Sequence, residues 1–287
     1  MAYTSFAELE AAAAHAGSLG LAAIALEVEE SDLTQTQVRE RMAQALEVMR
    51  EAVATGLGSD VRSRSGFTGG DAARVAASQS GPVGGVFSAA IAAALATGEV
   101  NASMGRIVAA PTGGASGVLP AVLLTVGERV GASDDALVEA LFCAAGVGGV
   151  FAARATLSGA AGGCQAEIGT GAAMAAAAAV ELSGGTPSQA GHAAALAMQG
   201  LLGLVCDPVA GLVEVPCVHR NGTGVAVALA GAEMALAGVE FAIPLDEVVD
   251  AASWVGRSIP PSLRETSRGG LAVTPTGKEM EGRVAAG

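Results

Sequence analysis

Residues 159–174 read GAAGGCQAEIGTGAAM, and they join a run of small residues to the first turns of an Ala-rich helix. Glycine interrupts regular structure, whereas alanine has the highest helix propensity of all residues. The segment therefore predicts a Gly-rich break followed by a helix. One of the four cysteines of the chain, Cys164, stands at the junction.

Amphipathic helical patterns occur on both sides of this segment. Residues 5–16 begin with the spacing of a capping box, and residues 134–142 and 245–255 are periodic apolar runs. Residues 33–55 place the following apolar side chains on one helical face: Val38, Met42, Ala45, Met49 and Val53. No set of alternating Val, Ile and Thr strands has the spacing of a sandwich, a barrel or a doubly wound sheet. The sequence therefore predicts an all-α fold.

The length of 287 residues allows one large domain or two small ones. We expect a single α-helical domain over residues 1–287. Its parts are an amphipathic N-terminal part at residues 1–60, a core that holds the functional site at residues 61–277, and a charged tail at residues 278–287.

Composition limits the compartment and the partners. Four cysteines without a close CxxC pair, and a start MAYTSFAELE without the features of a signal peptide, indicate a reducing, cytoplasmic location. A net charge of −13 with 3% aromatic residues does not provide the basic, aromatic face that nucleic acids require. We expect no nucleic-acid partner.

Two uncharged stretches, residues 107–127 and 182–206, are long enough to span a bilayer. They are dominated by Ala, Gly, Ser and Thr and contain internal prolines, whereas insertion is driven by Leu, Ile, Phe and Val. Neither stretch has a flank rich in Lys and Arg. We therefore expect helices buried within the protein and no membrane partner.

Gly-rich breaks separate the expected helices. They are SGFTGGDAA (65–73), NASMGRIVAAPTGGASG (101–117), SGAAGGC (158–164), CDPVAGLVEVPC (206–217), HRNGTG (219–224) and LRETSRGG (263–270). Small residues let neighbouring helices pack closely, which is one explanation of these breaks. However, Thr, Asp, Asn, Arg and Cys recur in them, and such groups are costly to bury without a polar role.

Three of the four cysteines lie beside these breaks. Cys143 lies mid-helix in ALFCAAG, as expected of a core thiol. Cys164 precedes a helix, whose dipole lowers the pKa of a thiol at its N-terminus. Cys206 and Cys217 are ten residues apart, which is the spacing of neither a zinc finger nor a bacterial ferredoxin. The spacing leaves open whether the three are buried structural thiols or metal ligands; three thiolates suit a cubane cluster with one open iron.

Longer motifs carry a family resemblance. They are GGCQAEIGTGAAMAAAA, GLVCDPVAGLVEVPCVHRN, NASMGRIVAAPTGGASG, SGFTGGDA and LRETSRGGLAVTPTG. In these motifs, and in their order over nearly the whole chain, the sequence resembles the α subunit of bacterial iron–sulfur-dependent L-serine dehydratase. The resemblance implies an all-helical catalytic domain with Gly-rich loops around a central [4Fe–4S] cluster. The three cysteine ligands of that cluster match Cys164, Cys206 and Cys217.

The resemblance also implies the reaction, in which L-serine is dehydrated and deaminated to pyruvate and ammonia. An iron with a free coordination position can bind the β-hydroxyl oxygen and take up the charge that develops there. The chain matches only the catalytic part of longer relatives, so we expect a separate β subunit. No cysteine follows Cys217, so the C-terminal cysteine that caps the open iron in some relatives has no counterpart here.

Polar groups in the breaks are candidates for binding and catalysis. The candidate bases for the Cα proton are His219, Asp71 and Glu167. The candidate substrate-binding residues are Ser65, Thr68, Gly69, Gly70, Asn101, Ser103, Thr112, Gly113, Gly114, Arg220 and Asn221. Backbone N–H groups and hydroxyls in Gly-rich turns can hold a carboxylate. Helix capping and salt bridges, such as a pair between Arg220 and Asp207, are the alternative roles for these side chains.

Pyridoxal phosphate is not expected as a cofactor. It would need a lysine in the core, and the one lysine of the chain, Lys278, lies in the charged tail. Two other functions remain open from the sequence: a related cluster lyase acting on threonine or cysteine, and a metal-binding subunit without catalytic activity.

Overall fold

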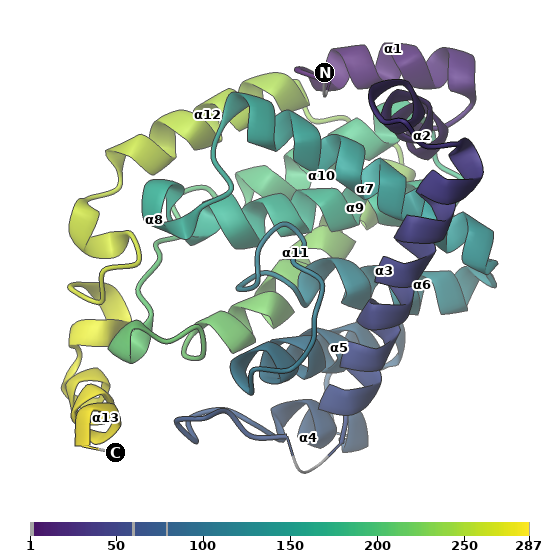
Figure 1. Ribbon diagram of the computed structural model, residues 1–287. Helices are drawn as coiled ribbons and strands as arrows, with labels where there is room; N and C mark the ends of the chain where they lie inside the picture. Colours follow the sequence, from purple (N-terminus) through teal and green to yellow (C-terminus); the bar gives the residue numbers. More distant parts are fainter. Residues whose placement is uncertain (1–2, 59–60, 79, 287) are drawn as a thin grey trace.

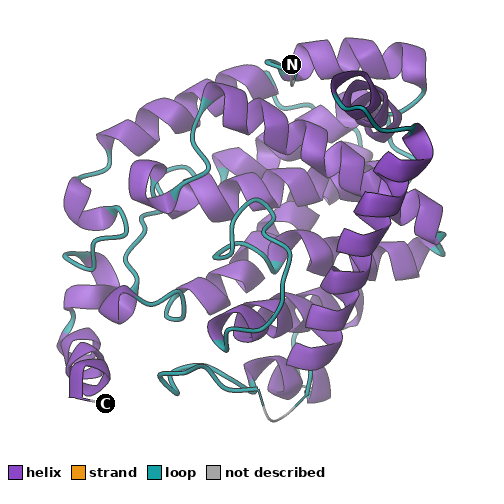
Figure 2. Ribbon diagram, in the orientation of Figure 1, coloured by secondary structure: helices purple, strands orange, loops and turns teal. Residues whose placement is uncertain are grey.

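The computed structural model describes residues 3–58, 61–78 and 80–286. Its α-helices are α1 (Phe6–Ala16), α2 (Leu19–Glu30), α3 (Gln35–Gly56), α4 (Asp71–Ala77), α5 (Gly85–Ala102), α6 (Val118–Val130), α7 (Asp134–Arg154), α8 (Gly159–Gly162), α9 (Thr170–Leu182), α10 (Pro187–Gln199), α11 (Cys217–Leu236), α12 (Leu245–Ser258) and α13 (Pro275–Ala286) (Figure 1). Short helical turns are η1 (Gln165–Gly169), η2 (Val209–Gly211), η3 (Pro261–Leu263) and η4 (Gly270–Val273). The described residues form no strand, only one isolated bridge between Cys206 and Arg264 (Figure 2). The predicted all-α fold is confirmed.

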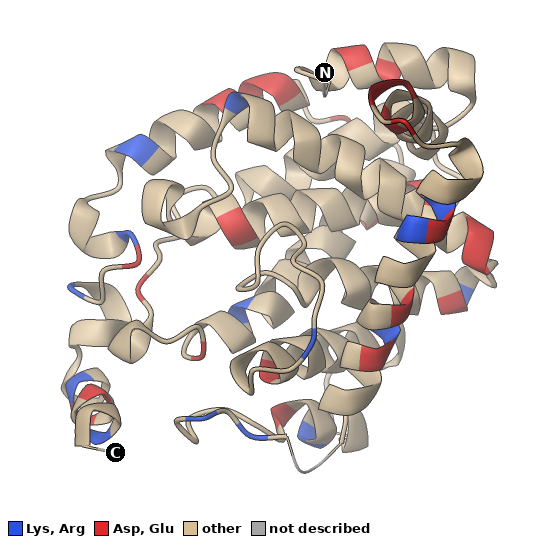
Figure 3. Cartoon of the chain, in the orientation of Figure 1, with Lys and Arg blue, Asp and Glu red and all other residues tan. Residues whose placement is uncertain are grey.

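Helix α9 lies at the centre of the fold. Every residue from Thr170 to Val180 is buried, and the helix packs against α6, α7, α10 and α11. A helix that is apolar on all sides is stable only when other helices surround it. Its alanines let these four neighbours approach closely, while the charged residues lie mostly on the outer helices (Figure 3). The Ala-rich segment that follows Cys164 is thus the central helix, entered through the π-helical turn η1.

The N-terminal helices begin at side-chain caps. The Ser5 hydroxyl accepts a hydrogen bond from the Glu8 N–H at 3.2 Å. The Glu8 carboxylate in turn accepts from the Thr4 N–H at 2.9 Å, one residue earlier than in a standard capping box. Helix α3, expected at residues 33–55, has a full capping box between Thr34 and Gln37.

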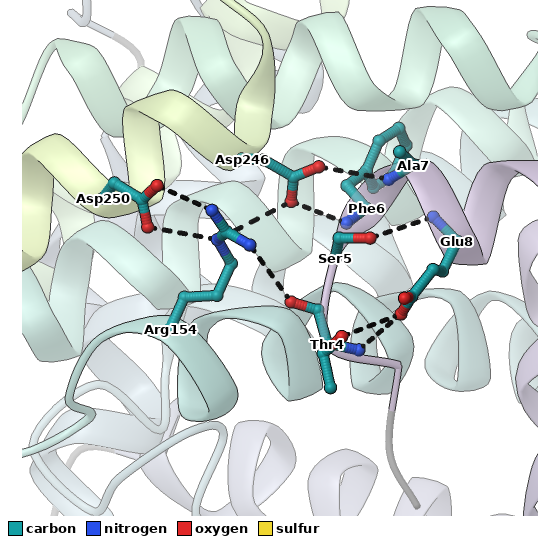
Figure 4. A network of polar contacts seen from close by, with 8 residues as sticks. All are labelled: Thr4, Ser5, Phe6, Ala7, Glu8, Arg154, Asp246 and Asp250. Carbon is teal, nitrogen blue, oxygen red and sulfur yellow. Dashed lines mark hydrogen bonds and ion pairs between the residues drawn. The ribbon is translucent and has the colours of Figure 1, made fainter.

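Arg154, at the end of α7, joins the start of α1 to α12 (Figure 4). Its guanidinium donates to both carboxylate oxygens of Asp250, at 3.1 and 2.6 Å, and to the Thr4 carbonyl at 3.4 Å. Asp246 accepts from the Phe6 N–H at 2.7 Å, at the N-terminus of α1. These contacts hold the N-terminal end of the chain against α12.

One expected break is helical in the structure. The segment HRNGTG (219–224) lies inside the first turns of α11, so the prediction of a break there was wrong. Its glycines serve packing: Gly222 faces Ile91 of α5, and Gly224 lies against Val118 of α6 and Ile168 of η1. Close approach between helices, rather than a turn, explains the small residues in this segment.

The uncharged stretches 107–127 and 182–206 are each interrupted by a turn or loop and are not single helices. Among the described residues, two other helices, α5 and α7, are long and apolar enough to cross a membrane. The bent pair α1 and α2 would add a third span if the two helices are counted together. In each of α5 and α7, 61% of the most apolar 18-residue stretch is buried against the rest of the protein.

Candidate functional site

Three cysteines from different segments meet beside α9. Cys164 precedes η1, Cys206 lies in the loop after α10, and Cys217 is the first residue of α11. All three are free thiols, exposed by only 2%, 3% and 8%. The fold therefore brings together residues that are up to 53 positions apart in the sequence.

The cysteine side chains interact directly. A hydrogen bond from the Cys206 thiol lowers the pKa of Cys164, and the same contact raises the pKa of Cys206. Burial raises the pKa of Cys217 to about 12, with a further contribution from the charge of Cys164. Without a bound cation, this group of thiols holds one negative charge more readily than two or three.

Arg220 supplies positive charge next to the cysteines. Its charge lowers the pKa values of Cys164 and Cys217, in each case as a smaller influence than hydrogen bonding or burial. The guanidinium is only 14% exposed and forms an ion pair with Asp207, Nη2 to Oδ1, at 2.8 Å. It also donates to the Val205 carbonyl at 2.9 Å. Arg220 is thus engaged by the loop that carries Cys206.

The C-terminal segment holds this loop in place. The Cys206 N–H donates to the Leu263 carbonyl at 2.9 Å, and the Glu265 N–H donates to the Cys206 carbonyl at 2.7 Å. The Arg264 guanidinium reaches across to the Ala161 carbonyl of α8 at 3.3 Å. The motif LRETSRGG (263–270) therefore fixes the second cysteine against the segment that carries the first.

Glu167 connects the cysteines to a cavity of about 990 Å³. Its carboxylate lies so close to Gly159 that a Cβ atom there would be 2.5 Å from Oε2 and 3.1 Å from the Cys206 sulfur. Burial raises the pKa of Glu167. No cysteine lines this cavity or the smaller one of about 350 Å³ between α2, α3 and α7.

The three thiols fit an iron–sulfur group in their chemistry. Thiolate sulfur is the usual protein ligand of such clusters, each of these thiols is free and buried, and Cys164 and Cys217 interact with the cationic side chain of Arg220. Among the described residues, no group of three or more His, Cys, Asp or Glu side chains is arranged to hold a single metal ion. The fit rests on the shared position of the three thiols and on the charge of Arg220.

Comparison with known proteins places the chain in a family. A family profile described as the serine dehydratase alpha chain matches residues 11–272. The chain belongs to the serine dehydratase alpha chain family. A "probable L-serine dehydratase, alpha chain" of Bacillus subtilis is 48% identical over 270 residues, which cover 92% of this chain and 89% of the relative.

Further members of the family show the same match. An "L-serine dehydratase, alpha chain" of Peptoniphilus asaccharolyticus is 44% identical, over 88% of each chain. An "L-serine dehydratase" of Streptomyces coelicolor is 38% identical over 89% of this chain, but the match covers 57% of that longer relative.

The structure brings five of the candidate residues named from the sequence to the cavity of this family member. They are Ser65, Asn101, Gly113, Gly114 and Glu167. They come from the loop before α4, the end of α5, the loop before α6, and η1. The cavity therefore lies where two of the Gly-rich breaks, 65–73 and 101–117, meet the turn η1.

Asn221 and Ser103 do not line the cavity. Asn221 is 1% exposed and joins α11 to the loop before α6: it accepts from the Gly117 N–H at 2.9 Å and donates to the Gly114 carbonyl at 2.8 Å. The Ser103 hydroxyl donates to the Val100 carbonyl at 2.9 Å, at the end of α5. Both side chains hold backbone that forms the wall of the cavity.

Asp71 and His219 form a pair outside the cavity lining. His219 Nε2 is 3.3 Å from Asp71 Oδ2, the imidazole is 52% exposed, and Asp71 also pairs with Arg74. Asp71 opens α4, where Gly69 and Gly70 form the preceding turn with positive φ.

Two candidate hydroxyls are buried: one has no hydrogen-bond partner among the described residues, and the other, that of Thr112, interacts with the Glu167 carboxylate. They belong to Thr68, which lies before this turn, and to Thr112, which lies in the loop before α6. The side chain of neither residue is among those that line the cavity.

Several residues that line the cavity were not predicted from the sequence. Arg64, Phe67, Glu214 and Arg283 all line the cavity. Glu214 was detectable in principle, because it is the one acidic side chain between two valines in the loop that joins Cys206 to Cys217. Arg283 was not, since only the fold brings α13 to the cavity, where the guanidinium lies 5.4 Å from the centre of the Phe67 ring.

Proposed function

We propose that the chain is the catalytic subunit of an iron–sulfur-dependent L-serine dehydratase, which releases pyruvate and ammonia. The observation that carries this proposal is the meeting of three buried free cysteines beside Glu167, a residue that also lines a large cavity. Relatives named L-serine dehydratase alpha chain, at 44–48% identity over most of the chain, support the substrate.

Cys164, Cys206 and Cys217 are the proposed ligands of a [4Fe–4S] cluster. When bound, a cluster with one open iron supplies a Lewis acid for the β-hydroxyl of serine, which is otherwise a poor leaving group. The chain offers three ligands, and Arg220 offsets part of their negative charge. Pyridoxal phosphate is not part of the proposal.

Glu167 is the proposed acceptor of the Cα proton. It is the one candidate base that lines the cavity, whereas Asp71 and His219 pair with each other outside the lining. Removal of this proton and loss of the β-hydroxyl as water leave aminoacrylate, which tautomerises to an imine. Hydrolysis of the imine gives pyruvate and ammonia, so atoms and charges balance without an oxidant.

The substrate carboxylate has partners in the loop before α6 and at the end of α5. Backbone groups at Gly113 and Gly114 and the side-chain amide of Asn101 line the cavity. Uncharged donors of this kind bind a carboxylate by hydrogen bonds. We further propose a separate β subunit as the partner and the cytoplasm as the location.

The test is product release from the anaerobically purified complex of this chain with its β subunit. L-serine should yield pyruvate and ammonia in equal amounts, and faster than L-threonine yields 2-oxobutanoate or L-cysteine yields pyruvate. A higher kcat/KM for threonine or cysteine would assign the chain to a related lyase. Absence of turnover on all three would favour a metal-binding subunit without catalytic activity.

A further inference from the structure

Glu214 is a buried carboxylate that no side chain among the described residues neutralises. It is 4% exposed and lies in the loop between Cys206 and Cys217, just before Pro216 and α11. Its Oε2 accepts a hydrogen bond from the Ser65 hydroxyl. Among the residues that the structure describes, it has no ion-pair partner. Burial of an unpaired carboxylate is unfavourable, which points to a cation that is supplied from outside the chain.

The position of Glu214 indicates where that cation binds. Glu214 and Ser65 both line the cavity of about 990 Å³ that Glu167 connects to the cysteines. Among the described residues, Oε1 of Glu214 accepts no hydrogen bond, and this oxygen is not fully buried. The free oxygen of Glu214 is therefore accessible to a small molecule in this cavity.

Ser65 fixes the orientation of the carboxylate. Its hydroxyl donates to Glu214 and at the same time accepts from the Phe67 N–H at 3.0 Å. This arrangement leaves the hydroxyl proton directed at Glu214. The backbone of Glu214 is also held, because its carbonyl accepts a hydrogen bond from the Val218 N–H of α11 at 2.9 Å. The carboxylate is thus positioned before any ligand binds.

Besides the second carboxylate, Glu167, the lining also carries charge of the opposite sign. Arg64 and Arg283 contribute guanidinium groups to the cavity, and neither forms an ion pair with Glu214. A cavity that displays a separate carboxylate and separate cations is complementary to a zwitterion. An α-amino acid has both charges on one carbon atom.

We propose that Glu214 binds the α-ammonium group of the amino-acid substrate and so restricts the cavity to amino acids. This inference rests on the proposed function, in that it names the substrate contact of the same site. It assigns Glu214 a binding role, while Glu167 next to the cysteines keeps the role of proton acceptor. Ser65 is a positioning residue that acts through Glu214.

The test compares two ligands that cannot be dehydrated. L-alanine keeps the ammonium and carboxylate groups, whereas propanoate lacks the ammonium group. Their dissociation constants are measured by calorimetry on the anaerobic complex with the β subunit, for the unchanged protein, Glu214→Gln and Glu240→Gln. Glu240 is exposed and remote from the cavity lining, so this variant is the matched control.

The unchanged protein and Glu240→Gln should bind L-alanine in preference to propanoate, and Glu214→Gln should lose that preference. The same variant should raise KM for L-serine about 10- to 100-fold, the usual effect of losing one hydrogen bond to a charged group. Ser65→Ala, which keeps the carboxylate, should weaken L-alanine binding less than Glu214→Gln does.

Three results would overturn the proposal. They are an unchanged preference in Glu214→Gln, an equal loss of both ligands, and Glu214-dependent binding of potassium chloride in place of the amino acid. The two proposals can fail separately. Glu214-dependent binding of L-alanine without turnover of L-serine would refute only the proposed function, while full turnover with an unchanged KM in Glu214→Gln would refute only this inference.

Discussion

Four buried cysteines divide into two kinds by what surrounds them. Cys143 is enclosed within α7, and burial raises its pKa well above the ordinary value. Cys164, Cys206 and Cys217 interact with one another, and the charge of Arg220 acts on Cys164 and Cys217. Burial alone therefore does not distinguish a ligand from a core thiol; proximity to other thiols and to a cation does.

Glu167→Gln should abolish most turnover and leave the cluster in place. The amide is isosteric but cannot accept the Cα proton, so kcat should fall about 10²- to 10⁴-fold. The ultraviolet–visible spectrum of the anaerobic protein should be unchanged, because Glu167 is not a proposed ligand. Glu233→Gln, at an exposed position of α11, is the control. A normal kcat in Glu167→Gln would assign the proton transfer to another group.

At the scale of single elements, helix α2 begins on a half-buried carboxylate. Glu181 of α9 accepts from the N–H groups of Leu19 and Gly20, at 2.9 and 3.1 Å. Burial raises the pKa of Glu181 to about 7, and the charge of Glu139 adds to this effect. The thiol of Cys143 also faces it. Arg39 does not offset this charge directly, because its ion pair, at 3.4 Å, is with Glu139.

The stability of the protein should therefore fall as the pH rises through the range in which Glu181 ionises. Below pH 4.5 this side chain is protonated in both the folded and unfolded states, and above about 7 it is ionised in both. In between, the folded state retains a proton that the unfolded chain has lost. The difference amounts to roughly 3 kcal/mol of unfolding free energy.

Glu181→Gln isolates this effect, because the amide oxygen can still accept from the start of α2. Relative to the unchanged protein, the variant should become more stable as the pH rises from 5 to 8. Denaturant titrations at several pH values measure the difference. A stability difference that does not vary with pH would contradict the assignment.

Gly270→Ala should loosen the loop that carries Cys206. Gly270 has φ of 60°, and a Cβ atom there would lie 2.2 Å from Oδ2 of Asp207, the carboxylate that pairs with Arg220. The strain and the clash should lower stability by about 2–4 kcal/mol and reduce the iron content. Gly282→Ala in α13, where a Cβ meets nothing within 4 Å, is the matched control. Equal stability of the two variants would show that the Asp207 contact is dispensable.

Helix patterns were predictable from the sequence because they are local. The apolar face at residues 33–55 correctly predicted α3, and the periodic run at residues 245–255 correctly predicted α12. The segment 219–224 was predicted wrongly as a break, because its glycines serve contacts with α5 and α6 that are distant in sequence. The bridge between Cys206 and Arg264 is equally non-local, and no pattern in either segment indicates it.

The cavity is a property of the whole molecule. Its lining comes from the loop before α4, the end of α5, the loop before α6, η1, the loop before α11, and α13, which lie in widely separated parts of the chain. The sequence indicated five of these residues through their Gly-rich surroundings. It could not indicate Arg283, and although the flanking valines mark out Glu214, the charge of that residue did not reveal its burial.

The isolated chain should have little activity, and addition of the β subunit should raise it greatly. The physical reason is that the cavity has an open side among the described residues, lined by exposed groups such as Met104. Water must be kept from the reacting groups for efficient elimination. Pyruvate release is measured with and without the β subunit at equal iron content. Full activity of the isolated chain would contradict the proposed partner.

The central claim is that three of the four cysteines hold an iron–sulfur cluster. The most direct measurement is the iron and acid-labile sulfide content of anaerobically purified protein in four variants: Cys164→Ala, Cys206→Ala, Cys217→Ala and Cys143→Ala. The account predicts that the first three lose iron and sulfide together, while Cys143→Ala retains both. Retention of iron and sulfide by any of the first three variants, or their loss only in Cys143→Ala, would contradict it.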